Sequence, residues 1–111
     1  MIAFNPTGAI LGFTGANTAP TSVQATSQNG VATQQYCLTN TDVANDCIVG
    51  WSSTDAGAKL QAVGGVGNTN CYYLLARSQV VVTGPVGAFF SGITPGSAVT
   101  AVIKVQAGYG A

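Results

Sequence analysis

Few residues in this chain can do chemistry, and their types restrict which chemistry is open to it. Neither His nor Glu occurs among the 111 residues, so general acid–base work would fall to Asp, Lys, Tyr or Cys. A cysteine nucleophile is usually activated by a neighbouring base such as His. Asp42 and Asp46 flank a turn, where Asp side chains typically accept hydrogen bonds from nearby backbone amides. The sequence therefore predicts no catalytic residues, no cofactor and no enzyme.

The three cysteines, Cys37, Cys47 and Cys71, do not form a metal-binding pattern. Zinc sites usually take four ligands, often with a C-x-x-C pair and His as the common alternative, whereas these cysteines are ten and twenty-four residues apart. A hairpin between residues 34–40 and 46–52 would set Cys37 opposite Cys47, with Cβ atoms about 4.5–5.5 Å apart. The sequence favours three reduced thiols and no metal, and a Cys37–Cys47 disulfide is the alternative.

Charge is very scarce. Only 5% of the residues are charged and the net charge is zero, where a typical soluble domain has about 25% charged residues. A free monomer normally keeps a charged surface, whereas protein interfaces are depleted in Lys, Asp and Glu. We therefore expect neighbours in an assembly to cover much of the surface. The charged residues are Lys59, Arg77, Lys104, Asp42, Asp46 and Asp55.

The same composition excludes several other classes of protein. Three cations cannot neutralise the phosphates that duplex binding requires, so no nucleic-acid partner is expected. Polar residues and glycines interrupt every apolar run before it reaches eighteen residues, which argues against a membrane protein. The high hydrophobic content argues against disorder. Residues 1–6 show no basic region followed by an apolar core, so no cleavable secretion signal is expected.

Hydrophobic periodicity predicts strands along most of the chain. The clearest alternation covers residues 98–107, where apolar residues recur at every second position. Further strands are predicted at 21–26, 34–40, 46–52, 71–76, 79–83 and 87–91, with a tight connection at Arg77-Ser78. Residues 54–63 are compatible with a short helix or a loop lying over a sheet. One apolar face of the last strand consists of Val99, Ala101, Ile103, Val105 and Ala107.

About seven or eight short strands with frequent turn signals predict an all-β fold. The pattern is typical of an antiparallel β-sandwich or small barrel, and it does not separate an Ig-like from a jelly-roll-like topology. Residues 1–14 carry Pro6, Gly8 and Gly12, which suit an extended arm better than a core strand. We therefore expect an N-terminal arm at 1–14 and a single sandwich domain at 15–111.

Several short segments together resemble one class of viral protein. A leucine pair at residues 74–75 precedes the valine run 80–82, then Pro85, the block Phe89 to Thr94, and a closing Gly108-Tyr109-Gly110. Together with the segment Asn17 to Thr26 and the alanine-rich residues 56–58, these sequence segments resemble small virion proteins of tailed bacteriophages. The resemblance implies a structural virion protein at the capsid surface, a decoration or cement protein, or a component near the tail. It supplies no catalytic residues.

The resemblance also implies partners and a location. The expected partners are the major capsid protein and further copies of this chain, with a trimer by analogy to other decoration proteins. The chain would be made in the host cytoplasm and reside on the virion. The arm is expected to add a strand to a neighbouring sheet. The residues predicted to contact other proteins are Ile2, Phe4, Ile10, Leu11, Phe13, Trp51 and Tyr109.

Two other functions stay open at this point. Exposed aromatic residues beside polar side chains would define a receptor- or glycan-binding module of a phage tail or fibre. The aromatic candidates are Trp51, Tyr72, Tyr73 and Tyr109, with Asn68 and Asn70 as polar neighbours. A bacterial surface or pilus subunit is the third possibility, and it would need an export signal.

Overall fold

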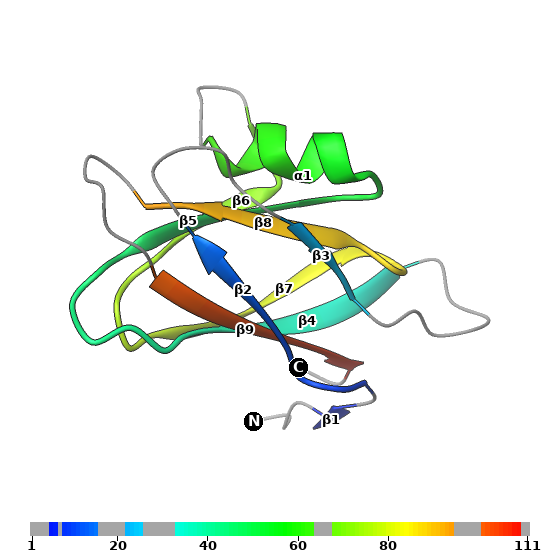
Figure 1. Cartoon of the computed structure of the whole chain (residues 1–111). Coiled ribbons are helices and arrows are strands. Elements are labelled where there is room, and N and C mark those ends of the chain that lie inside the picture. The colour runs from blue at the N-terminus through cyan, green and yellow to red at the C-terminus, as the bar shows by residue number, and fades with distance from the viewer. Residues whose placement is uncertain are drawn as a thin grey trace.

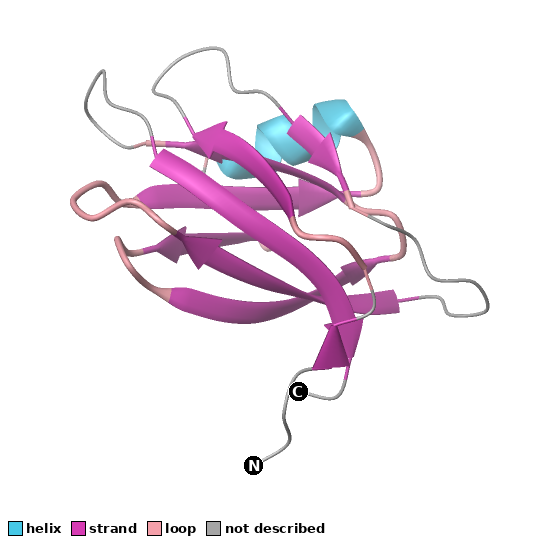
Figure 2. Cartoon of the chain, turned by 60° about the horizontal axis from the view of Figure 1, so that its bottom comes forward, coloured by secondary structure: helices cyan, strands magenta, loops and turns pink. Residues whose placement is uncertain are grey.

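The computed structural model describes residues 5–6, 8–15, 22–25, 33–63, 68–94 and 101–109. In this part of the chain, antiparallel strands form two sheets that pack face to face (Figure 1), and the turned view in Figure 2 shows the same two layers with one helix beyond them. The elements are β1 (Asn5–Pro6), β2 (Leu11–Gly15), β3 (Ser22–Gln24), β4 (Thr33–Asn40), β5 (Cys47–Ser52), α1 (Asp55–Ala62), β6 (Cys71–Leu74), β7 (Gln79–Pro85), β8 (Phe89–Ile93) and β9 (Ala101–Tyr109).

The strand order resolves the topology that the sequence left open. Sheet A has the order β1-β9-β4-β7, with β2 also paired to β9, and sheet B has the order β3-β8-β5-β6. Strands pair as a nested series, β2 with β9, β3 with β8, β4 with β7 and β5 with β6. A long hairpin rolled onto itself in this way is a jelly roll. The predicted all-β sandwich is thus confirmed, in its jelly-roll form.

The core lies between the sheets and follows the predicted alternation. Along β9, Ala101, Ile103, Val105 and Ala107 are buried while the residues between them face outward, as predicted for 98–107. Rings fill the centre: Tyr36 meets Phe90 edge to face with centroids 4.8 Å apart. Such pairs add to the stabilisation that apolar burial provides.

The predicted hairpin between residues 34–40 and 46–52 is wrong. Strand β4 belongs to sheet A and β5 to sheet B, so the connection 41–46 crosses between the layers. The Asn40 side chain holds this crossing, because its amide donates to the carbonyl oxygens of Asn45 at 2.9 Å and Leu74 at 3.3 Å. Cys47 therefore points into the core and Cys37 points away from it. The two thiols are not opposite each other, and both are free.

Part of the predicted arm is built into sheet A. Residues 11–15 form β2, whose register runs from Leu11 opposite Val105 to Gly15 opposite Ala101. Asn5 and Pro6 pair farther along β9. Strand β2 continues through Gly15, across the boundary that was expected after residue 14 between the arm and the sandwich domain. Residues 1–4, including Ile2 and Phe4, lie outside the described residues.

The short helix α1 covers the outer face of sheet B, in agreement with the prediction for residues 54–63 (Figure 1). Thr54 caps its N-terminus by accepting a hydrogen bond from the Gly57 amide at 3.0 Å, as capping residues do. Its buried residues are Ala58 and Ala62. An added Cβ at Gly50 of β5 would lie 2.2 Å from the Ala62 nitrogen. Small side chains on both partners therefore let the helix backbone lie directly on the sheet.

Candidate protein-contact surface

One broad surface of the sandwich is not covered by any described element. It is the side of sheet A that faces away from the core, and we call it the outer face of sheet A. Alternate side chains of four adjacent strands reach it, because successive residues of a strand point to opposite faces. These residues are Gly12 and Thr14 of β2, Val102, Lys104 and Gln106 of β9, Gln35, Cys37 and Thr39 of β4, and Gln79, Val81 and Thr83 of β7.

The outer face of sheet A is nearly free of charge. All six charged residues of the chain lie in described segments, and Lys104 is the one on this face. Asp55 and Lys59 belong to α1 on the opposite side, where they form an ion pair at 3.3 Å. The other three lie in the connections 41–46 and 75–78. Solvent-exposed sheet faces usually carry polar and charged residues, so a face of Gln, Thr and Val with one Lys is unusual.

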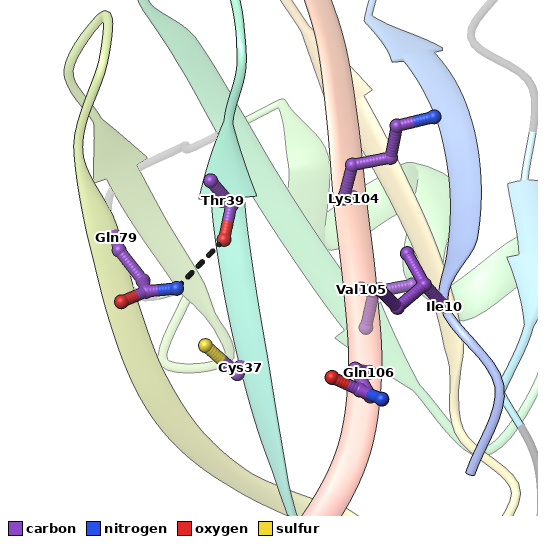
Figure 3. A pocket seen from close by; sticks show the side chains of 7 residues that line it. All are labelled: Ile10, Cys37, Thr39, Gln79, Lys104, Val105 and Gln106. Carbon is purple, nitrogen blue, oxygen red and sulfur yellow. Dashed lines mark hydrogen bonds between the residues drawn. The ribbon is translucent and has the colours of Figure 1, made fainter. Parts of the chain in front are cut away.

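The one lysine on this face extends toward β2. An added Cβ at Gly12 would lie 3.1 Å from the Lys104 ammonium nitrogen, so the side chain crosses the glycine. Figure 3 shows it directed away from β4 and toward β2. The ammonium group therefore sits over the β2 side of the sheet, and the β4–β7 half of the outer face carries no charged residue.

Hydrogen bonds organise the side chains around a shallow hollow on this face (Figure 3). Gln79 donates to the Thr39 hydroxyl at 3.0 Å, and Gln106 donates to the Gly8 carbonyl at 3.0 Å. The hollow has a volume of about 140 Å³, well below the roughly 300–1,000 Å³ of small-molecule pockets. Its size suits a side chain of a protein partner. It is lined by Ile10, Cys37, Thr39, Gln79, Lys104, Val105 and Gln106.

The cysteines do not supply a reactive group to this surface. Burial raises the pKa of the Cys37 thiol, partly opposed by a hydrogen bond with Thr39, so this thiol stays protonated at neutral pH. Burial raises the pKa of Cys47 to about 12. Within the described segments, no three His, Cys, Asp or Glu side chains gather in a way that could hold a metal ion.

The connections 41–46 and 75–78 meet at one end of the sandwich and use the acidic residues structurally. Asp42 accepts hydrogen bonds from the Ala44 and Asn45 amides, both at 2.8 Å, which confirms the predicted turn role. These bonds lower the pKa of Asp42. Asp46 reaches across instead and accepts from the Ala76 amide at 2.8 Å. Both carboxylates are thus committed to backbone amides.

The predicted contact residues are spread over different environments. Ile10 is 63% exposed and lines the hollow. Leu11 is half-buried against the core, and Phe13 and Trp51 are 5% and 6% exposed in it, so these two offer little surface to a partner. The backbone of Tyr109 pairs with Asn5, and its side chain is outside the described set.

Sequence reasoning missed most residues of the outer face because they are polar. The period-two pattern already separated them from the core side of each strand, as for Val102, Lys104 and Gln106 in the last strand. The signal available in the sequence was the absence of charge on that polar side.

An aromatic glycan platform is not assembled among the described residues. Trp51 lies in the core. Tyr72 and Tyr73 are 44% and 50% exposed, but adjacent residues of a strand point to opposite faces. The Tyr73 hydroxyl lies 3.5 Å from the Asp46 carboxylate. The two tyrosines therefore cannot stack against one sugar ring together.

Comparison with known proteins gives no family. No protein-family model matches the sequence, and no curated protein matches it. Among solved structures, one similar chain comes from Bacillus endospore appendages, described as disulfide-linked pili; it has 14% identity and a TM-score of 0.44 over 99% of this chain and 90% of that one. A second is the Yersinia pseudotuberculosis-derived mitogen, with 14% identity and a TM-score of 0.47 over 94% of this chain and 86% of that one. These likenesses identify neither a family nor a function.

None of the helical residues described forms a segment long and apolar enough to cross a membrane.

Proposed function

We propose that this protein is a non-catalytic structural subunit that binds other proteins through the outer face of sheet A, as a decoration protein on a phage capsid. The observation that carries the proposal is the distribution of charge. Five of the six charged residues lie in α1 or in the connections, and the broadest uncovered sheet face has Lys104 alone. A surface kept this free of charge over four strands has the composition of a protein interface.

The physical advantage of such a face is a low cost of desolvation. Burying an ionised side chain without a partner is expensive, whereas Gln and Thr can be buried if they are hydrogen-bonded. Gln79 and Thr39 already bond each other. Lys104 extends over Gly12 on the β2 side, so a partner seated on β4 and β7 leaves its ammonium group in water.

The capsid assignment rests on the sequence resemblance of residues 17–26, 56–58 and 71–111 to small tailed-phage virion proteins. The jelly-roll topology is compatible with it, because this fold occurs in viral capsid proteins as well as in lectins and cupins. The fold alone does not determine a function. What the resemblance adds is the identity of the partner, the major capsid protein.

Particles that lack the protein provide the test. Purified protein is added back, bound copies are counted, and the resistance of the shell to heat is measured. Gln35→Glu places a carboxylate on the outer face of sheet A, on β4 opposite Thr83 of β7, in the half of the face that carries no charge. Val63→Glu is the matched control, because Val63 is 57% exposed and follows α1 on the opposite side.

We expect wild-type protein and Val63→Glu to bind and to raise the heat resistance of the shell. Gln35→Glu is expected to bind at least about tenfold more weakly, because an unpaired charge would be buried at the interface. Equal binding by both variants would show that another surface makes the contact. No binding by the wild type would contradict the capsid assignment itself.

A further inference from the structure

Strand β7 ends sheet A, and among the described strands its one neighbour in the sheet is β4. It runs from Gln79 to Pro85, seven residues. It is longer than the other described strands that have a single paired neighbour, namely β1 with two residues, β2 with five, β3 with three and β6 with four. An exposed edge of this length offers a row of backbone groups on which another strand can pair.

The ladder shows which backbone groups of β7 point outward. The Asn40 amide donates to the Ser78 carbonyl at 2.9 Å, and the register continues through Leu38 opposite Val80. In an antiparallel pair, hydrogen-bonded positions alternate with positions that direct their N–H and C=O groups away from the partner. Even-numbered residues of β7 therefore bond to β4. The groups of Gln79, Val81 and Thr83 point away from the sheet.

This edge lacks the features that normally prevent strand pairing. Natural edge strands are protected by charged residues, by proline, by bulges or by being very short. Residues 79–83 read Gln-Val-Val-Val-Thr, with no charge and no proline, and Pro85 stands at the far end of the strand. The pairing with β4 runs from Gln79 to Pro85 without a bulge.

We propose that the partner at this edge is the β7 strand of a second copy of the chain, paired antiparallel about a two-fold axis at Val81. In this register Val81 of one copy lies opposite Val81 of the other. Val80 lies opposite the other copy's Val82, and Gln79 lies opposite the other copy's Thr83. Gln79, Val81 and Thr83 each donate and accept one main-chain hydrogen bond across the axis. Every residue pair joins β-branched or uncharged side chains, which favours cross-strand pairing, and no like charges meet.

The occupant is a second copy because the strand is complementary to itself in this register. An interface that uses the same patch on both subunits closes as a dimer, which differs from the trimer expected by analogy. Pairing would join the uncharged β4–β7 halves of two outer faces of sheet A into one continuous surface. The dimer does not depend on the proposed capsid function, because it forms from the purified protein alone.

A pair of double variants tests both the edge and the register. Gln79→Lys with Thr83→Lys places like charges opposite each other across the axis. Gln79→Lys with Thr83→Glu places opposite charges there instead. Both variants lose the same bond from Gln79 to Thr39, and Gln79 and Thr83 are exposed. Thr14→Lys with Ala44→Lys adds the same charge at exposed sites away from β7, and circular dichroism confirms that each variant is folded.

Sedimentation equilibrium over a range of concentrations gives the mass of each protein. We expect the wild type, the Thr14/Ala44 control and the Lys/Glu variant to reach twice 11.1 kDa. The Lys/Lys variant is expected to dissociate at concentrations at least about tenfold higher than the Lys/Glu variant does. A monomeric wild type, a trimer, or equal association of the Lys/Lys and Lys/Glu variants would overturn the proposal. A monomeric wild type would refute the dimer but not the proposed function, because the particle-binding experiment tests that function separately.

Discussion

The hydroxyl of Tyr36 joins three parts of the sandwich, and removing it gives a quantitative test of the core. The phenol belongs to β4 and is fully buried. Its hydroxyl donates to the Pro85 carbonyl at the end of β7 and accepts from the Ala88 amide at 3.3 Å. Burial raises the pKa of Tyr36, so the group stays a protonated donor. Tyr36→Phe would leave a half-buried carbonyl and a buried amide without this partner.

Leaving buried polar groups unpaired costs about 1–3 kcal/mol in the free energy of unfolding. Unfolding entropy is about 2.1 cal/mol/K per residue, so for 111 residues each 1 kcal/mol lowers Tm by about 4 °C. We therefore expect Tyr36→Phe to lower Tm by roughly 4 to 13 °C in calorimetry. Tyr73→Phe is the matched control, because this residue is 50% exposed, and it should change the unfolding free energy by less than about 0.5 kcal/mol. Equal Tm values for the two variants would refute the role assigned to the Tyr36 hydroxyl.

Three further predictions concern the helix, the acid response and the thiols. Gly50→Ala should lower the free energy of unfolding in urea by about 1–3 kcal/mol or more, because its Cβ would meet helix backbone; Gly12→Ala, whose Cβ meets the flexible end of a lysine, should cost much less. The lowered pKa of Asp42 contributes stability above the ordinary carboxyl pKa of about 4, and this is lost as the pH falls through the lower folded value; Asp42→Asn should therefore weaken the decline in urea stability on acidification. Cys47, with a pKa of about 12, should resist iodoacetamide in the folded protein and react in urea, as peptide mass spectrometry would show; alkylation of the folded protein at this residue would contradict its burial.

The sequence predicted the local structure better than it predicted the pairing of strands. Alternation along residues 101–107 reflects burial on one face of β9, which is a local property and is readable from side chains alone. Strand pairing in a jelly roll joins distant segments, such as β2 with β9. Neighbouring runs such as 34–40 and 46–52 look like a hairpin because nothing local shows that the chain changes sheets at 41–46.

The contact residues were hard to predict for a related reason. Large apolar side chains were expected to mark the interface, but Phe13 and Trp51 fill the core of the domain itself. Strand β5 is apolar on both faces because α1 covers its outer side, and Gly50 allows that close contact. The exposed surface that stands out is instead defined by missing charge. That feature becomes visible once the register brings Thr39, Gln79 and Gln106 together on one face.

Imaging intact particles at a resolution that distinguishes strands from helices tests most directly whether the outer face of sheet A is a protein interface. We predict density for this jelly roll on the capsid surface, with β4 and β7 turned toward a neighbouring protein and α1 turned toward solvent. Particles without such density, or copies whose outer face of sheet A is open to solvent while α1 makes the contacts, would contradict the proposed function.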